Sequence, residues 1–308
     1  MFQIFLGLTP FIFITLLGFL FGRFKILDLG HAKILNLFLF YVAVPALIIN
    51  FVAQSEIGQI DLRQIVSYFL MQTTCGVFTF FVTSKYFKRP IPESIIWSLT
   101  VALSNHVTLL LPITEIYFED DVITQVASII LMDGVILLSL ITFFLELATK
   151  SNVKLFYFLK NIIFNPMILS ILIGVSLFIL NFDIDNTPIE YTLEKLASCV
   201  SPVGLFAIGI ILSFYTNKVL NKLTLSISLL KLVISPIILL LIGFTFFDSG
   251  LPKEIPGAFF VSVAPCGATA IVLCSAYNVS PENIIKAIFI STFASIGTIF
   301  FAIKYLTL

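Results

Sequence analysis

The length of its apolar stretches constrains this chain more than any other feature of the sequence. Clusters of charged residues divide it into about ten runs, near residues 2–22, 33–53, 63–86, 92–118, 122–147, 161–181, 191–215, 224–247, 255–277 and 283–305. A helix needs roughly 20 apolar residues to cross the hydrocarbon core of a bilayer. Because these runs are too long and too little alternating for the strands of a barrel, we expect an all-α integral membrane protein.

The composition supports lipid as the solvent of this chain. Of its 308 residues, 59% are hydrophobic and 11% are charged, whereas a soluble domain carries roughly 25% charged residues. The net charge of zero argues against a nucleic-acid partner, which would require a basic face. No metal site, disulfide framework or cofactor is predicted, because all four cysteines lie singly in apolar runs: Cys75, Cys199, Cys266 and Cys274.

Basic residues between the runs predict the orientation in the membrane. The connections that follow the odd-numbered runs hold twelve Lys and Arg, and the opposite side holds four. Since Lys and Arg concentrate in cytoplasmic loops, we expect a multi-pass protein of the plasma (inner) membrane with both termini outside the cytoplasm. The uncharged start, Met1-Phe2-Gln3, favours a first spanning helix over a cleavable signal peptide.

The two halves of the sequence can be aligned with each other. Ordered matches pair Pro10 with Pro166, Gly18 with Gly174, Pro45 with Pro202, Glu93 with Glu254, Thr108 with Thr269 and Ile123 with Ile284. Five helices per half is an odd number, so the second half enters the membrane from the opposite side. We therefore expect one transmembrane transporter domain over 1–308, built as two inverted five-helix repeats (1–147 and 161–308) that a short cytoplasmic linker (148–160) joins.

The fourth and ninth runs carry helix-breaking residues at equivalent depths, about a dozen residues into each run. Proline removes a backbone donor and clashes with the preceding turn, and a half-helix N-terminus attracts anions. We predict that helices four and nine are broken, and that the substrate binds at Ser104, Asn105, His106, Thr108, Pro112, Pro265, Gly267 and Thr269. The alternative is a pair of proline kinks whose polar side chains bond neighbouring helices.

Ionisable side chains inside the runs form a second set of candidates. Asp133 lies eleven residues into the fifth run, too deep to reach water, and we predict that it takes up a proton or helps to hold a cation such as sodium. A purely structural role for Asp133 is the alternative. Lys231 and Glu115 lie nearer the ends of their runs and are interpreted as snorkelling side chains. Helix breaks or hinges are predicted at Pro45, Pro112, Pro202 and Pro265.

Motifs along nearly the whole chain resemble those of the auxin efflux carrier family in its compact prokaryotic form. Leu17-Gly18-Phe19-Leu20-Phe21-Gly22-Arg23 through Phe40-Tyr41-Val42-Ala43-Val44-Pro45-Ala46-Leu47-Ile48 is similar to the opening glycine helix of the family and its "f-y-v-x-x-P-a-L" second helix. Asn165-Pro166 with Ile173-Gly174, Leu205–Gly209, Lys231–Pro236, and Pro265 with Tyr277-Asn278 look like its sixth, seventh, eighth and ninth helices.

The resemblance implies ten helices in two inverted repeats, with helices four and nine crossing at their breaks. It also implies a scaffold part and a moving transport part, small organic anions such as auxin-like weak acids or dicarboxylates as substrates, and by analogy a homodimer. The fourth helix departs from the family pattern S-N-x-G-x-x-G-x-P, because Val107 and Leu110 replace its glycines. We expect that this departure changes the shape of the break.

A secondary carrier for a small organic anion is therefore the leading hypothesis. A sodium- or proton-coupled organic-anion symporter of similar build and a non-transporting membrane receptor or scaffold are the alternatives. An intramembrane enzyme is disfavoured, because the sequence has a single mid-membrane aspartate and no H-E-x-x-H motif. The sequence has no Walker motif either, which argues against transport driven by nucleotide hydrolysis.

Overall fold

The computed structural model describes residues 2–54, 61–149, 165–180, 182, 184, 186–215, 221–247 and 252–307. Within these residues the secondary structure is helical, apart from one isolated antiparallel bridge between Ser104 and Cys266. Seven of the described helices are long and apolar enough to cross a membrane: Leu6–Arg23, Leu29–Gln54, Leu62–Tyr86, Asp120–Thr149, Pro188–Phe214, Lys222–Gly243 and Glu282–Thr307. The predicted all-α, multi-pass membrane fold is thereby confirmed.

The ten-helix arrangement stays a prediction, although two shorter apolar helices, Ile91–Ala102 and Pro166–Ile179, accompany the seven long ones. Most of the predicted linker (150–160) and the start of the sixth run (161–164) lie outside the described residues.

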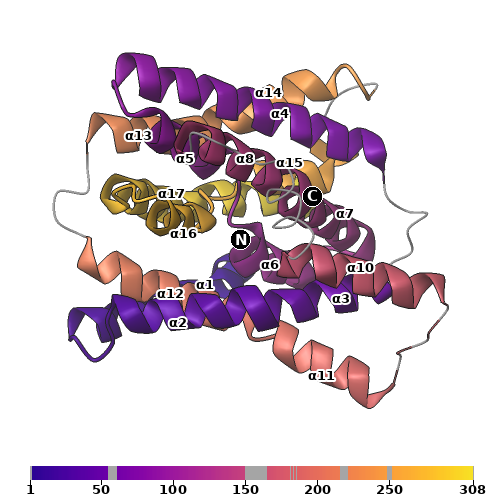
Figure 1. The fold of residues 1–308 in the computed structure, drawn as a ribbon. Helices are drawn as coiled ribbons and strands as arrows, with labels where there is room; N and C mark the ends of the chain where they lie inside the picture. Colours follow the sequence, from indigo (N-terminus) through magenta and orange to yellow (C-terminus); the bar gives the residue numbers. More distant parts are fainter. Residues whose placement is uncertain are drawn as a thin grey trace.

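Figure 1 shows how the helices follow one another in space. The first half comprises α1 (Phe2–Arg23), α2 (Leu29–Phe38), η1 (Leu39–Ala43), α3 (Val44–Gln54), α4 (Leu62–Phe81), η3 (Val82–Tyr86), α5 (Ile91–Ala102), η4 (His106–Leu110), α6 (Leu111–Tyr117), α7 (Asp120–Met132), η5 (Asp133–Leu137) and α8 (Leu138–Thr149). The second half comprises α10 (Pro166–Ile179), α11 (Pro188–Ala197), α12 (Val200–Phe214), α13 (Lys222–Leu229), η6 (Leu230–Ile234), α14 (Ser235–Gly243), η7 (Pro252–Glu254), α15 (Pro256–Ser262), α16 (Thr269–Ala276) and α17 (Glu282–Thr307).

Side-chain caps fix where several of these helices begin. Asp28 accepts a hydrogen bond from the backbone N–H of His31, and the His31 ring bonds back to the Asp28 backbone, which makes a capping box at the start of α2. The hydrogen bond from the His31 backbone, followed by that from its ring, holds the pKa of the Asp28 carboxyl below its ordinary value. Asp61 caps α4 in the same manner by accepting from the N–H of Arg63.

Three prolines each follow a turn of π-helix. Pro45 stands two residues after η1, Pro112 two residues after η4 and Pro236 two residues after η6. Proline has no N–H to donate to the carbonyl four residues before it. In the π-helical turn just before the proline, the hydrogen bonds span five residues instead of four. The helix therefore continues through the proline instead of ending. Pro45 and Pro112 therefore lie inside helical segments, and their predicted role as hinges stays a prediction.

The helices form two groups by contact. In the first group, α1 packs on α12, and α3 packs on α10 and α11. In the second group, α4 packs on α5 and α14, α7 packs on α15, and α13 packs on α17. Figure 1 shows the long helix α2–α3 and α4 on opposite sides of the molecule. The boundary between the groups is crossed where α12 meets η4 and α17.

Close helix packing within the first group depends on glycine. A Cβ added at Gly18 of α1 would overlap the backbone carbonyl of Phe206 in α12. A Cβ at Gly174 of α10 would lie 2.7 Å from the Cβ of Val52 in α3. Both backbones therefore approach their neighbours too closely for a larger residue, as small residues permit in membrane helices.

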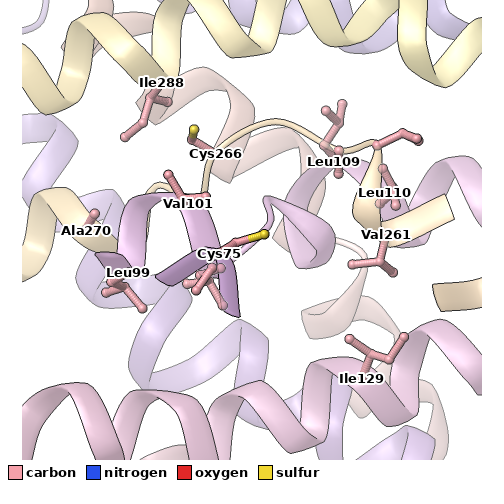
Figure 2. Packing of buried hydrophobic residues seen from close by; sticks show 14 of the residues in the cluster. Cys75, Leu99, Val101, Leu109, Leu110, Ile129, Val261, Cys266, Ala270 and Ile288 are labelled. Carbon is pink, nitrogen blue, oxygen red and sulfur yellow. The ribbon is translucent and has the colours of Figure 1, made fainter. Parts of the chain in front are cut away.

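The largest buried core lies mostly in the second group, with Leu8 and Phe11 of α1 and Leu205 of α12 added from the first, and it encloses both places where the helices are interrupted. Leu103, Val263 and Cys266 are among its residues. Figure 2 shows the side chains around them, with Cys75 from α4, Leu99 and Val101 from α5, Ile129 from α7, Val261 from α15 and Ile288 from α17. The interruptions are thus buried inside the protein, which is where irregular backbone is tolerated at membrane depth.

Candidate functional site

The two interrupted segments meet each other. α5 ends at Ala102 and helical structure resumes at His106, while α15 ends at Ser262 and α16 begins at Thr269. The N–H of Asn105 donates to the carbonyl of Pro265 at 3.0 Å, and the N–H of Gly267 donates to the carbonyl of Leu103 at 2.8 Å. The interrupted backbones therefore satisfy part of each other's hydrogen-bonding requirement in a site without bulk water.

A buried lysine lies beside this meeting point. The ammonium of Lys231, which is 0% exposed, donates to the hydroxyl oxygen of Ser104 at 2.7 Å. Ser104 gives its own proton to the carbonyl of Val261 at 2.9 Å, so the Tyr68 hydroxyl, 3.1 Å away, donates to Ser104 as well. The expectation that Lys231 snorkels to the membrane surface is wrong, because its side chain turns inward to this acceptor.

His106 and Asp133 form a buried pair. The Nε2 of His106 lies 2.8 Å from the Oδ2 of Asp133, and their side chains are 6% and 1% exposed. The other polar atoms of the pair, His106 Nδ1 and Asp133 Oδ1, have no hydrogen-bond partner among the described residues. Both groups can bind a proton, so the pair is a candidate place for proton exchange.

Among the described residues, the side-chain amide of Asn105 has a hydrogen-bond partner for its oxygen but none for its nitrogen. The Thr108 hydroxyl donates to Asn105 Oδ1, whereas Asn105 Nδ2 is buried without a partner among the described residues. Thr108 lies against α12, because a Cβ on Gly204 would meet the methyl group of Thr108. The free donors of Asn105 are therefore held close to the boundary between the two helix groups, where they can bind an acceptor from a ligand.

Comparison with known proteins assigns the chain to a family. The sequence model of the family described as "Membrane transport protein" matches residues 3–303. The chain belongs to this membrane transport protein family. The predicted resemblance to the auxin efflux carriers is confirmed, and membership of this family points to a transporter and not to an enzyme.

One curated relative of the transporter is a Rhizobium meliloti (strain 1021) protein named "Putative malonate transporter". The two sequences are 27% identical over 140 residues, which cover 46% of the transporter and 43% of the relative. The alignment thus spans less than half the length of either protein.

The transporter gathers most of the predicted site residues at one place. Ser104, Asn105, Pro265 and Gly267 form the meeting point itself, and His106 lies beside them with Asp133. A Cβ on Gly267 would lie 2.9 Å from the Leu103 carbonyl, so this contact requires glycine. The remaining predicted residues are placed as follows: Thr108 in η4, Pro112 in α6, Thr269 at the start of α16, Pro45 in α3 and Pro202 in α12. Their roles in binding stay predictions.

π-helical turns carry all three ionisable residues of the site. His106 opens η4, Asp133 opens η5 and Lys231 lies in η6. A π-helical turn leaves a backbone carbonyl without its usual donor and rotates the following side chains, and such turns are frequent at functional sites. The sequence shows that these residues are charged and deep, but it does not show the turns that aim them at one another.

Two features of the transporter site escaped the sequence analysis. Tyr68 and Lys231 join Ser104, and only the depth of a charge in the eighth run could have pointed to Lys231. The start of α15 is held by two glutamines from other helices. Gln64 of α4 accepts from the N–H of Ala258 at 2.8 Å, and Gln125 of α7 accepts from the N–H of Gly257 at 3.0 Å. Within the described residues no cluster of three potential metal ligands is found.

Proposed function

We propose that the transporter is a secondary carrier that moves a small organic anion across the plasma membrane by alternating access. The observation that carries this proposal is the amide of Asn105, buried at the meeting point of two broken helices with its Nδ2 unpaired. Burying a donor without an acceptor is costly unless a ligand or water supplies one. A carboxylate oxygen is the acceptor that best suits the surroundings, because Lys231 places a buried cation on the neighbouring Ser104 while Asp133 is already paired with His106.

Helix ends add to this positive character. Helical structure resumes at His106 after the first interruption and at Thr269 after the second. Both starts lie within a few residues of the paired backbones, and the N-terminus of a helix carries a partial positive charge. The name of the Rhizobium meliloti relative makes malonate the first dicarboxylate to test. Auxin-like weak acids form the second class.

The inverted repeat is part of the proposal, with ten crossings made by the seven long helices, α10 and the two interrupted segments. Gly18 and Gly174, which the sequence alignment of the halves pairs, have equivalent neighbours. Gly18 of α1 packs on α12, and Gly174 of α10 packs on α3. The alignment of the halves pairs α1 with α10 and α3 with α12. Exchanging the halves therefore turns the contact between α1 and α12 into the contact between α10 and α3, as a two-fold relation requires. The antiparallel pairing of Ser104 with Cys266 likewise joins corresponding segments of the two halves.

Alternating access is proposed to occur by movement of the second helix group along the first. Ser104, Asn105 and His106 follow α5, Asp133 follows α7, and Lys231 lies between α13 and α14, so a bound anion would travel with these helices of the second group. The first group, which presents Gly204 to Thr108, would act as the scaffold and as the surface of a homodimer. Both termini are proposed to lie outside the cytoplasm, as the distribution of Lys and Arg predicts.

Coupling to protons is favoured as the energy source. The observation behind it is the hydrogen bond of 2.8 Å between His106 and Asp133, which places an imidazole that can accept a proton beside a buried carboxyl. Proton uptake by this pair would offset the charge of an entering anion. A sodium-coupled carrier is the competing form, and the dependence of flux on each gradient separates the two.

The test is a flux assay in liposomes that contain the purified protein. Labelled malonate and a labelled auxin-like weak acid are offered with a pH gradient, with a sodium gradient and with neither. We expect uptake of at least one anion that Asn105→Ala lowers at least tenfold. Asn36→Ala in α2 makes the same chemical change away from the meeting point and is expected to transport normally. Binding without flux would instead favour a receptor or scaffold.

A further inference from the structure

A long groove runs along the outside of the second helix group. It encloses a volume of about 740 Å³ between η6, α14, α15 and α17. Its walls are mostly apolar and include Val233, Pro236, Ile237, Phe259, Phe301 and Ala302. The groove is separate from the candidate transport site, because its lining includes none of the residues of that site: Ser104, Asn105, His106, Asp133 and Lys231.

One end of the groove is positively charged. Lys253 of η7 and Lys304 in the last turn of α17 line it together with Tyr305. The ammonium of Lys253 lies 5.8 Å from the centre of the Tyr305 ring. Among the described residues, neither lysine has a carboxylate within salt-bridge distance. Two lysines for which the described residues offer no counter-ion, and one interfacial aromatic residue, thus stand at the end of the apolar groove.

This combination selects an amphiphile with an anionic head. The apolar walls offer nothing to a small polar anion, whereas a hydrocarbon chain packs against them by van der Waals contact. The two lysines supply the attraction for the phosphate of a lipid headgroup. We propose that the groove binds one anionic phospholipid, with its phosphate between Lys253 and Lys304 and an acyl chain along Phe301 and Ile237.

The floor of the groove connects the lipid to the broken backbone. Val263, where α15 has just ended, lines the groove, and its carbonyl accepts a hydrogen bond of 2.8 Å from the Thr298 hydroxyl of α17. An acyl chain in the groove lies over this contact and holds α15 against α17. Bound lipid therefore stabilises the second interruption from the outside, and a change in thermal stability reports its binding.

The first experiment compares lipids by their effect on thermal unfolding of the purified full chain in detergent. Phosphatidylglycerol is expected to raise the unfolding temperature more than phosphatidylcholine does, and inorganic phosphate is expected to have no effect. The double substitution Lys253→Gln and Lys304→Gln should remove the advantage of phosphatidylglycerol. Lys195→Gln is the matched control, because Lys195 also lies over a tyrosine ring, 5.1 Å from Tyr191, but does not line the groove.

The second experiment tests the apolar body of the site by native mass spectrometry. Val233→Phe places a ring in the groove and should lower the fraction of protein that retains phosphatidylglycerol at least threefold. Leu241→Phe, at an exposed position of α14 outside the groove, should leave that fraction unchanged. Equal stabilisation by both lipids, stabilisation by phosphate alone, or full lipid retention by the lysine double variant would overturn the proposal. None of these results depends on transport, so the function proposed above is tested separately.

Discussion

The ammonium of Lys231 donates a hydrogen bond of 2.7 Å to the hydroxyl oxygen of Ser104, a residue 127 positions earlier in the chain. This bond brings a buried cation from η6 to the interruption after α5. We predict that Lys231→Met lowers anion uptake at least tenfold, because it removes the positive charge from the site. The substitution also removes the cost of burying a charge, and it leaves Ser104 bonded to Val261 and Tyr68. The unfolding temperature should therefore change little, and uptake at the parental rate would contradict the role of Lys231.

Ser104 is predicted to matter for stability as well as function. Ser104→Ala leaves the Lys231 ammonium and the Tyr68 hydroxyl without their acceptor. An unsatisfied buried polar group costs about 1–3 kcal/mol, so unfolding in a denaturant should show a loss of this size. Ser176→Ala is the control, because Ser176 is exposed and bonds only to the carbonyl of Leu172 in its own helix. A loss of equal size in both variants would remove the special role of Ser104.

Asp133 is predicted to link uptake to pH. Asp133→Asn keeps the shape of the side chain but cannot exchange a proton with His106. Uptake driven by a pH gradient should fall to the level seen without a gradient, while exchange of labelled for unlabelled anion should continue. Asp120→Asn, at the exposed start of α7, is expected to behave like the parent. A pH response that survives in Asp133→Asn would place proton coupling elsewhere.

The close approach of α1 and α12 gives a prediction about stability alone. Gly18→Ala should destabilise the protein, since its Cβ would overlap the Phe206 carbonyl of the neighbouring helix. Gly297→Ala in α17 introduces the same methyl group where no atom lies within 4 Å. Alanine favours a helix over glycine by roughly 0.5–1 kcal/mol, so Gly297→Ala should be neutral or stabilising. The difference between the two variants in thermal unfolding checks this.

Gly267 offers a test of the paired interruptions. Gly267→Ala brings a Cβ to 2.9 Å from the Leu103 carbonyl, which accepts the Gly267 N–H. Because the backbones must separate to admit it, we expect uptake to fall at least tenfold. Slower hydrogen exchange of the Gly267 and Asn105 amides in the parent than in the variant would tie that loss to the pairing. Normal uptake by the variant would show that the pairing is dispensable.

Helix-breaking residues pointed to the fourth and ninth runs, but not to the form that the interruptions take. Pro265 lies between the end of α15 and the start of α16, and its role as a hinge stays a prediction. Pro112 lies in α6, eight residues after Ser104, where it follows a π-helical turn. The first interruption is set by tertiary contacts of Ser104 and Asn105 with residues more than 150 positions away. Local patterns carry no information on such partners.

The glycines that the fourth helix lacks illustrate the same limit. Val107 and Leu110 stand where the family pattern has glycine, and both lie in η4. The π-helical turn widens the helix at these positions, and Leu110 is fully buried within it. The departure from the family pattern indicated a changed break, whereas the compensating turn depends on how the surrounding helices pack.

Each half of the chain satisfies backbone groups of the other, through the hydrogen bonds of Leu103–Asn105 with Pro265–Gly267. A polypeptide that ended after the first half would expose the Leu103 carbonyl and the Asn105 amide inside a membrane that has no donor or acceptor to offer them. The first half therefore cannot complete its fold as it leaves the ribosome. The Leu103 carbonyl and the Asn105 N–H stay unpaired until residues 265–267 have been synthesised and inserted.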